Sequence, residues 1–184
     1  MAQVKHYLKV SDFFEKDNLQ LINWYAKIRH NINKESFSTE DIGNSSIYGD
    51  TFFDTYLIHK KKFIQDKCKK NLLPLCSMFN AYVNGSSEQL RIRNPLHEVT
   101  CLINLGDDGI NWPLIIGNDR QDEIDLKSGE ALIFSGNFLK CGRKGFFTGD
   151  HMFILELNYC ALTPYNENVR FEGRADLATP PLQT

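Results

Sequence analysis

The stretch Lys127-Ser128-Gly129-Glu130-Ala131-Leu132-Ile133-Phe134 joins a tight turn to a short segment of strand propensity. Gly and Ser favour the turn, and the large apolar residues that follow favour the strand. The same alternation of short strands and turns continues on both sides, from Leu73 to Tyr159. It predicts strands at 76–83, 99–105, 112–116, 123–126, 131–134 and 152–159.

Two helical patterns precede this region. Ser11 and Asp12 stand before an apolar set with helical spacing and can cap it, which predicts a helix over 12–30. A second apolar face predicts a helix over 51–70, in which the run Lys60-Lys61-Lys62 forms a solvated surface.

Helices first and strands after them predict an α+β chain whose core is a sandwich or a small barrel. We expect one domain over 1–184, with helical support and loop at 12–70 and the strand core at 73–160. Residues 31–50 are rich in Asn, Ser and Thr, which predicts a surface loop of the length of a functional lid. Residues 167–184 have few large apolar side chains and are predicted to form a tail.

The composition is that of an ordinary globular chain: 184 residues with 21 Lys+Arg against 23 Asp+Glu and a formal net charge of -2. This balance lacks the positive excess that nucleic-acid binding needs, and no apolar run reaches the roughly 18 residues of a membrane span. We therefore expect neither nucleic acid nor a membrane as a partner, and a cytoplasmic location. The five cysteines include no Cys-x-x-Cys pair, which argues against a disulfide framework or a structural zinc site.

The common catalytic signatures are absent from the sequence. It has no P-loop, no Gly-x-Gly-x-x-Gly, no Gly-x-Ser-x-Gly and no His-Glu-x-x-His. The pair His97-Glu98 would point its two side chains to opposite faces of a strand, so both cannot easily line one site.

Four blocks of residues follow one another between Leu73 and Tyr159. They are Leu73-Pro74 to Tyr82 with Asn84-Gly85-Ser86; Pro95 with Glu98-Val99-Thr100 and Ile103-Asn104-Leu105; Trp112-Pro113-Leu114; and Ser128 to Gly136 with Leu139, Arg143 and Gly149-Asp150. In order and spacing this set resembles the prolyl-4-hydroxylase-like branch of the iron(II)/2-oxoglutarate oxygenases. Residues 48–54 are also similar to the family's lead-in helix. The resemblance implies a double-stranded β-helix, a jelly-roll barrel, with N-terminal helices packed on one sheet.

Iron in this family is bound by two histidines and one carboxylate, which leave open positions for 2-oxoglutarate and oxygen. The family's His-x-Asp falls on Arg91-Ile92-Arg93, and its distal histidine falls on Cys141. A guanidinium is always protonated and has no lone pair for a metal, so the resemblance implies a site that has lost its iron ligands. The basic residue that anchors 2-oxoglutarate falls near His151.

The substituted site predicts a cationic pocket. Arg91 and Arg93 share one face of a strand, and Arg143 lies two residues beyond the distal position. These guanidinium groups either bind an anionic ligand or pair with local carboxylates such as Glu98 or Glu156, and the sequence leaves both alternatives open. The candidate ligand-binding residues are Tyr82, Arg91, Arg93, Glu98, Arg143 and His151.

Cys141 and Arg143 are the candidates for chemistry. A thiolate at Cys141 would be favoured by nearby arginines, as in nucleophilic cysteines. No histidine stands close in sequence to act as a base, and a lone cysteine is more often a packing residue. Both interpretations of Cys141 stay open.

Three hypotheses follow. The first is a degenerate oxygenase-fold protein without metal or cofactor, which binds a small anionic ligand or a protein partner, or catalyses a non-oxidative step on a small carboxylate-bearing substrate. The second is an active hydroxylase that holds Fe(II) and 2-oxoglutarate with the unconventional ligands His97, Glu98 and His151. The third is an interaction role for the 31–50 loop or the C-terminal tail.

Overall fold

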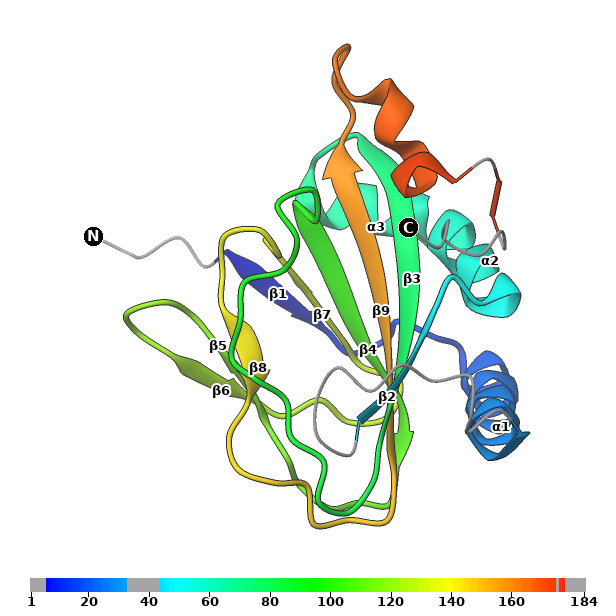
Figure 1. Ribbon diagram of the computed structural model, residues 1–184, viewed down its shortest axis with the longest axis vertical. Coiled ribbons are helices and arrows are strands. Elements are labelled where there is room, and N and C mark those ends of the chain that lie inside the picture. The colour runs from blue at the N-terminus through cyan, green and yellow to red at the C-terminus, as the bar shows by residue number, and fades with distance from the viewer. Residues whose placement is uncertain (1–5, 33–43, 175, 178–184) are drawn as a thin grey trace.

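The computed structural model describes residues 6–32, 44–174 and 176–177, which form two antiparallel sheets with helices on one side (Figure 1). The larger sheet has the strand order β1-β7-β4-β9-β3-β2, and the smaller sheet has the order β6-β5-β8. The strands are β1 (Tyr7–Val10), β2 (Asn44–Tyr48), β3 (Leu72–Tyr82), β4 (Val99–Asp107), β5 (Leu114–Ile116), β6 (Asp122–Ile124), β7 (Ala131–Phe134), β8 (Cys141–Arg143) and β9 (Met152–Ala161). The helices are α1 (Lys16–Ile32), α2 (Thr51–His59), α3 (Lys61–Cys68) and the 3-10 segment η2 (Glu167–Gly173).

Alternation along the central strand β9 separates two apolar clusters. Phe153, Leu155 and Leu157 belong to the cluster between the larger sheet and the helices. Met152 and Ile154 point the other way, into the cluster between the two sheets. The predicted α+β fold with a barrel core is confirmed.

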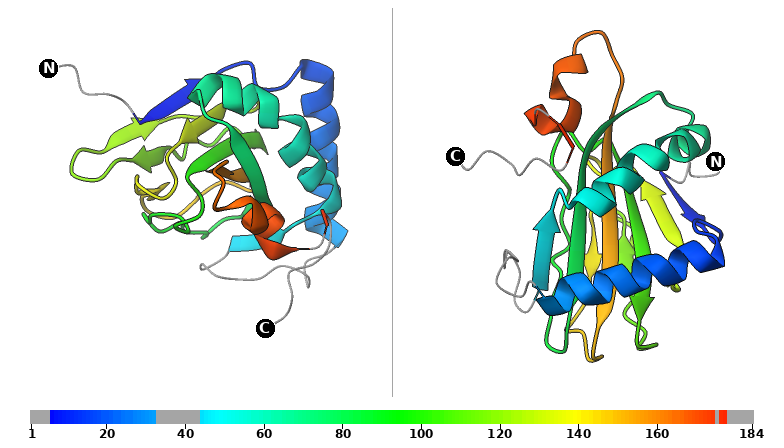
Figure 2. Two further views of the ribbon diagram at one scale, coloured as in Figure 1. Left: turned by 90° about the horizontal axis from the view of Figure 1, so that it is seen from above. Right: turned by 90° about the vertical axis from the view of Figure 1, so that its right-hand side faces the viewer.

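Helices α1, α2 and α3 pack across the outer face of the larger sheet (Figure 2). The Asp50 carboxylate caps α2, because it accepts hydrogen bonds from the backbone N–H groups of Phe52 and Phe53 at 3.0 and 3.3 Å. Phe53 then stacks on Phe79 of β3, with ring centroids 5.1 Å apart. These contacts fix the helical layer to β3, which carries one side of the site described below.

The prediction of a single helix over 51–70 is wrong, because the chain turns between α2 and α3 at Lys60. The Lys60 ammonium donates a hydrogen bond to the Phe13 carbonyl at 2.7 Å and lies 4.9 Å from the centroid of the Phe13 ring. Burial lowers its pKa. Lys60 is thus not part of a solvated surface, and the turn lets it pack on aromatic rings.

The sequence did not predict β1, β2 or β8, which are short strands of three to five residues. Part of the predicted 31–50 loop is strand β2, which pairs with β3, and residues 33–43 lie outside the described residues. The first part of the predicted tail forms η2, while 175 and 178–184 are likewise not described. In the described part of the chain, no helix combines the length and apolarity needed to cross a membrane.

Candidate functional site

A cavity of about 330 Å³ lies at one end of the barrel, between β2, β3 and the segment 88–97. Nearby, Arg91 pairs with Cys141 through an isolated antiparallel bridge that joins this segment to β8. The lining carries charges of both signs. Its charged residues and its histidine are Glu88, Arg91, Arg93, His97, Glu156 and Glu172.

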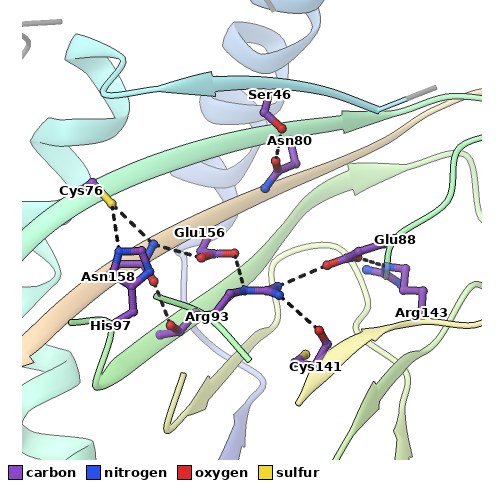
Figure 3. A network of polar contacts seen from close by, with 11 residues as sticks. Ser46, Cys76, Asn80, Glu88, Arg93, His97, Cys141, Arg143, Glu156 and Asn158 are labelled. Carbon is purple, nitrogen blue, oxygen red and sulfur yellow. Dashed lines mark hydrogen bonds and ion pairs between the residues drawn. The ribbon is translucent and has the colours of Figure 1, made fainter. Parts of the chain in front are cut away.

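Arg93 is the central residue of the site (Figure 3). Its guanidinium lies 3.2 Å from Glu156 through Nε and 3.2 Å from Glu88 through Nη2, and it donates a third hydrogen bond to the Cys141 carbonyl. Burial lowers the pKa of Arg93, but the charges of Glu156 and Glu88 outweigh burial and raise it above its ordinary value. Arg93 is therefore a fixed cation held by two buried carboxylates.

Glu88 links this group to Arg143. The second carboxylate oxygen of Glu88 lies 3.2 Å from Arg143 Nε, and another Arg143 nitrogen donates to the Trp112 carbonyl. The Arg143 guanidinium also lies 4.8 Å from the Trp112 ring centroid. Arg143 does not line the cavity, so its contacts are those of a buried structural residue. Tyr82 lines the cavity beside Glu88, and burial, with the Glu88 charge second, raises its pKa.

The two arginines inside the barrel are thus balanced by two carboxylates. Of the two alternatives that the sequence left open, pairing with local carboxylates occurs, and Glu156 is one of the partners. This balance removes most of the positive field that Arg93 and Arg143 would otherwise give the pocket.

Of the two interpretations of Cys141, the environment of the side chain favours a packing residue over a thiolate. The side chain is fully buried, and burial raises the pKa of its thiol to about 12 although the Arg93 charge opposes this. Desolvation of the thiolate outweighs the guanidinium because Glu88 and Glu156 offset the positive charge. Cys141 is a protonated thiol at neutral pH.

Two other predicted site residues lie away from the cavity. Glu98 accepts a hydrogen bond from the backbone N–H at the C-terminal end of β9 at 3.2 Å. His151 packs against Phe153 before the other end of that strand, with ring centroids 5.2 Å apart. Since β9 has 10 residues, of about 3.3 Å each, roughly 30 Å separates them. His97, Glu98 and His151 therefore do not form the alternative metal site.

The inner face of β9 holds no basic side chain. Met152 and Ile154 point into the barrel, and Glu156 continues this face to its bond with Arg93. His151 is one residue out of phase with this face, so its side chain lies on the helix side with Phe153. The position expected to anchor 2-oxoglutarate thus lies outside the barrel.

A second polar cluster, which no sequence pattern predicts, lies at the same cavity and consists of Cys76, His97 and Glu172. His97 Nε2 lies 2.8 Å from Glu172 Oε1 and 3.8 Å from Cys76 Sγ. Tyr48 donates its hydroxyl hydrogen to the other Glu172 oxygen. Burial raises the pKa of Glu172, but the hydrogen bonds from His97 and Tyr48 outweigh it and hold that pKa below its ordinary value. Cys76 lies on β3, His97 lies just before β4 and Glu172 lies on η2. Because the three residues are far apart in the sequence, no spacing motif predicts the cluster.

Comparison with known proteins gives matches among solved structures only, since no protein-family model and no curated protein matches the sequence. A prolyl-4-hydroxylase from Pseudomonas putida superposes with a TM-score of 0.68 at 13% identity, over 86% of this chain and 94% of that chain. A prolyl hydroxylase from Trichoplax adhaerens, in complex with a hypoxia inducible factor peptide fragment, gives 0.69 at 12% identity over 86% and 84%. HygX from Streptomyces hygroscopicus, with nickel and 2-oxoglutarate bound, gives 0.67 at 10% identity over 85% and 83%.

The chain has the iron(II)/2-oxoglutarate oxygenase fold. The fold expected from the four sequence blocks is therefore confirmed.

The residues at the expected iron-ligand positions of this oxygenase fold do not fit an iron ion. Arg91 and Arg93 offer no lone pair, and the Arg93 guanidinium is engaged by two carboxylates. Cys141 offers a single buried thiol that keeps its proton. 2-Oxoglutarate has no basic partner on the inner face of β9, where Met152 and Ile154 stand.

Proposed function

We propose that this oxygenase-fold protein binds a small carboxylate-bearing molecule in the cavity and does not carry out iron-dependent hydroxylation. The observation that carries the proposal is the Arg93 guanidinium, held 3.2 Å from Glu88 and 3.2 Å from Glu156. Arg93 thus places a fixed cation at a position where the oxygenase fold is expected to supply a metal ligand.

A carboxylate is the ligand group that this cavity suits best. Arg91 lines the cavity from an exposed position, where a guanidinium can receive a carboxylate through two parallel hydrogen bonds. The neutral side chains of Asn80 and Asn94 line the same space. Glu156 and Glu172 add negative charge, which disfavours a polyanion and favours a ligand that also carries an amino or other donor group.

Thermal unfolding of the full chain in the presence of chelator tests the proposal, because a ligand that binds only the folded state raises the unfolding temperature. The probes are glutamate, 2-oxoglutarate, citrate and phosphate, added separately. We expect the amino carboxylate glutamate to stabilise the protein most, and citrate and phosphate least. Arg91→Gln should weaken binding of the best probe about tenfold or more, since hydrogen bonds to charged groups contribute about 1.5–3 kcal/mol.

Arg120→Gln is the matched control, because Arg120 is an exposed arginine outside this cavity. It should bind the probe as the unmodified chain does. Equal weakening in both variants, or no stabilisation by any carboxylate, would refute ligand binding at Arg91. Turnover of 2-oxoglutarate by the unmodified chain with Fe(II) would refute the claim that hydroxylation is absent.

A further inference from the structure

Cys76, His97 and Glu172 converge at the edge of the cavity, and we propose that they bind a zinc ion with an open coordination position toward the cavity. These residues are none of the three at the expected iron-ligand positions, which are occupied by Arg91, Arg93 and Cys141. The inference goes beyond the proposed function and does not depend on it.

The geometry suits tetrahedral zinc. One ligand atom from each residue, the Cys76 sulfur, a His97 ring nitrogen and a Glu172 carboxylate oxygen, all lie within 4.8 Å of one another. Zinc bonds of about 2.3 Å to sulfur and 2.0–2.1 Å to nitrogen or oxygen place such atoms about 3.3 to 3.6 Å apart. The His97 contacts of 2.8 and 3.8 Å bracket this range and the Cys76–Glu172 pair lies within 4.8 Å, so side-chain shifts of about 1 Å complete the site.

The His97 ring nitrogen that faces the other two residues is the one that would bind the metal. Nδ1 is buried without a partner among the described residues, whereas Nε2 faces Cys76 and Glu172. His97 and Glu172 line the cavity, while Cys76 is fully buried behind them. Three protein ligands with a free side toward a cavity are the arrangement of zinc sites that keep one open position.

The carboxylates around Cys76 also favour a cation. A Glu172 oxygen lies within 4.8 Å of the Cys76 sulfur. Glu156 accepts a hydrogen bond at 3.0 Å from the Asn158 amide that faces this sulfur. Two negative groups beside the sulfur suit a divalent ion.

Surrounding residues hold two of the ligands in place. Asn158 Nδ2 lies 3.7 Å from the Cys76 sulfur, and its carbonyl accepts a hydrogen bond from Thr100 at 2.8 Å. Glu172 has a left-handed backbone with φ 54°, which is unfavourable for a non-glycine residue and is kept where neighbouring contacts enforce it. Such outer contacts orient metal ligands in known zinc sites.

Cobalt titration of the full, chelator-treated chain tests the site. We expect one Co²⁺ per chain, a thiolate-to-cobalt charge-transfer band in the near ultraviolet, and displacement of that cobalt by one equivalent of Zn²⁺. Cys76→Ser should abolish the band and weaken zinc binding by about a hundredfold or more, since even outer-shell changes cost 10–100-fold. Glu172→Gln should keep the band and weaken zinc binding by at least about tenfold.

Cys141→Ser is the matched control, because Cys141 is a buried barrel cysteine outside the proposed site. It should keep both the band and the affinity. Absence of a thiolate band in the unmodified chain, or its loss in Cys141→Ser but not in Cys76→Ser, would overturn the proposal. If Cys76→Ser does not fold, the unmodified spectrum and Glu172→Gln still decide. Carboxylate binding is measured with chelator, so its failure and the failure of the zinc site are distinguishable.

Discussion

At the scale of single residues, Arg93 is the side chain on which the barrel end depends most. Its removal leaves Glu88 and Glu156 buried with less compensation, and breaking a buried pair by deleting one partner costs about 3–5 kcal/mol. We expect Arg93→Met to lower the free energy of unfolding by about this amount, measured by equilibrium urea denaturation.

The loss of stability in Arg93→Met should come from uncompensated buried charge rather than from the change in side-chain volume. Adding Glu156→Gln to Arg93→Met removes the carboxylate that loses its ion pair, whereas Glu88 keeps its ion pair with Arg143, and should recover a large part of the stability. Arg91→Met is the control, since Arg91 is exposed, and it should change the free energy of unfolding by less than about 1 kcal/mol. No recovery in the double variant Arg93→Met, Glu156→Gln would show that packing of the Arg93 side chain is the dominant contribution.

At the scale of elements, a buried ion pair fixes η2 to helix α2, and a hydrogen bond from the same arginine fixes it to the larger sheet. Arg174 Nη1 lies 2.8 Å from Asp54 of α2, and Nη2 donates to the Leu75 carbonyl of β3 at 3.1 Å. Since Asp54 is fully buried, we expect Arg174→Met to cost about 3 kcal/mol or more and to speed backbone hydrogen exchange across 167–173. Because η2 carries Glu172, zinc binding should weaken as well.

Arg170→Met provides the matched control on the same segment. Arg170 is exposed and lies over the Phe171 ring, 4.6 Å from its centroid, without a buried carboxylate partner among the ion pairs of the described residues. Exchange across η2 should stay close to that of the unmodified chain. Equal acceleration by both variants would mean that the Asp54–Arg174 pair does not hold the segment.

Local patterns predicted the elements whose signals are local. The strand at 131–134 was predicted with the same bounds that it has in the structure, because a turn sequence and an apolar run define it. The edge strand β2 was missed, since Asn44, Ser45 and Ser46 have turn-like composition and only pairing with β3 makes them a strand.

The site was predicted in part, for related reasons. Block spacing placed Arg91, Arg93 and Cys141 beside one another, and Arg91 and Cys141 do form a bridge. His151 was placed by counting alone, whereas strand alternation decides on which face it lies. Cys76 and Glu172 come from β3 and η2, and their approach to His97 depends on tertiary structure that no local pattern encodes.

At the scale of the whole molecule, the proposed absence of hydroxylation rests on two separate features of the oxygenase-fold barrel. The expected iron ligands are replaced at 91, 93 and 141, and the inner face of β9 supplies Met152 and Ile154 where a basic anchor would be needed. Restoring only the iron ligands should therefore restore metal binding without restoring the binding of 2-oxoglutarate.

The variant Arg91→His, Arg93→Asp, Cys141→His tests this separation. We expect it to bind Fe(II) under anaerobic conditions, because it gains three ligands and leaves Glu88 and Glu156 to favour a cation. It should neither be stabilised by 2-oxoglutarate nor consume oxygen with it. Adding Ile154→Arg places a guanidinium on the inner face of β9 and should be required before 2-oxoglutarate raises the unfolding temperature. Oxygen consumption by the triple variant alone would show that another group of this barrel can hold the cosubstrate.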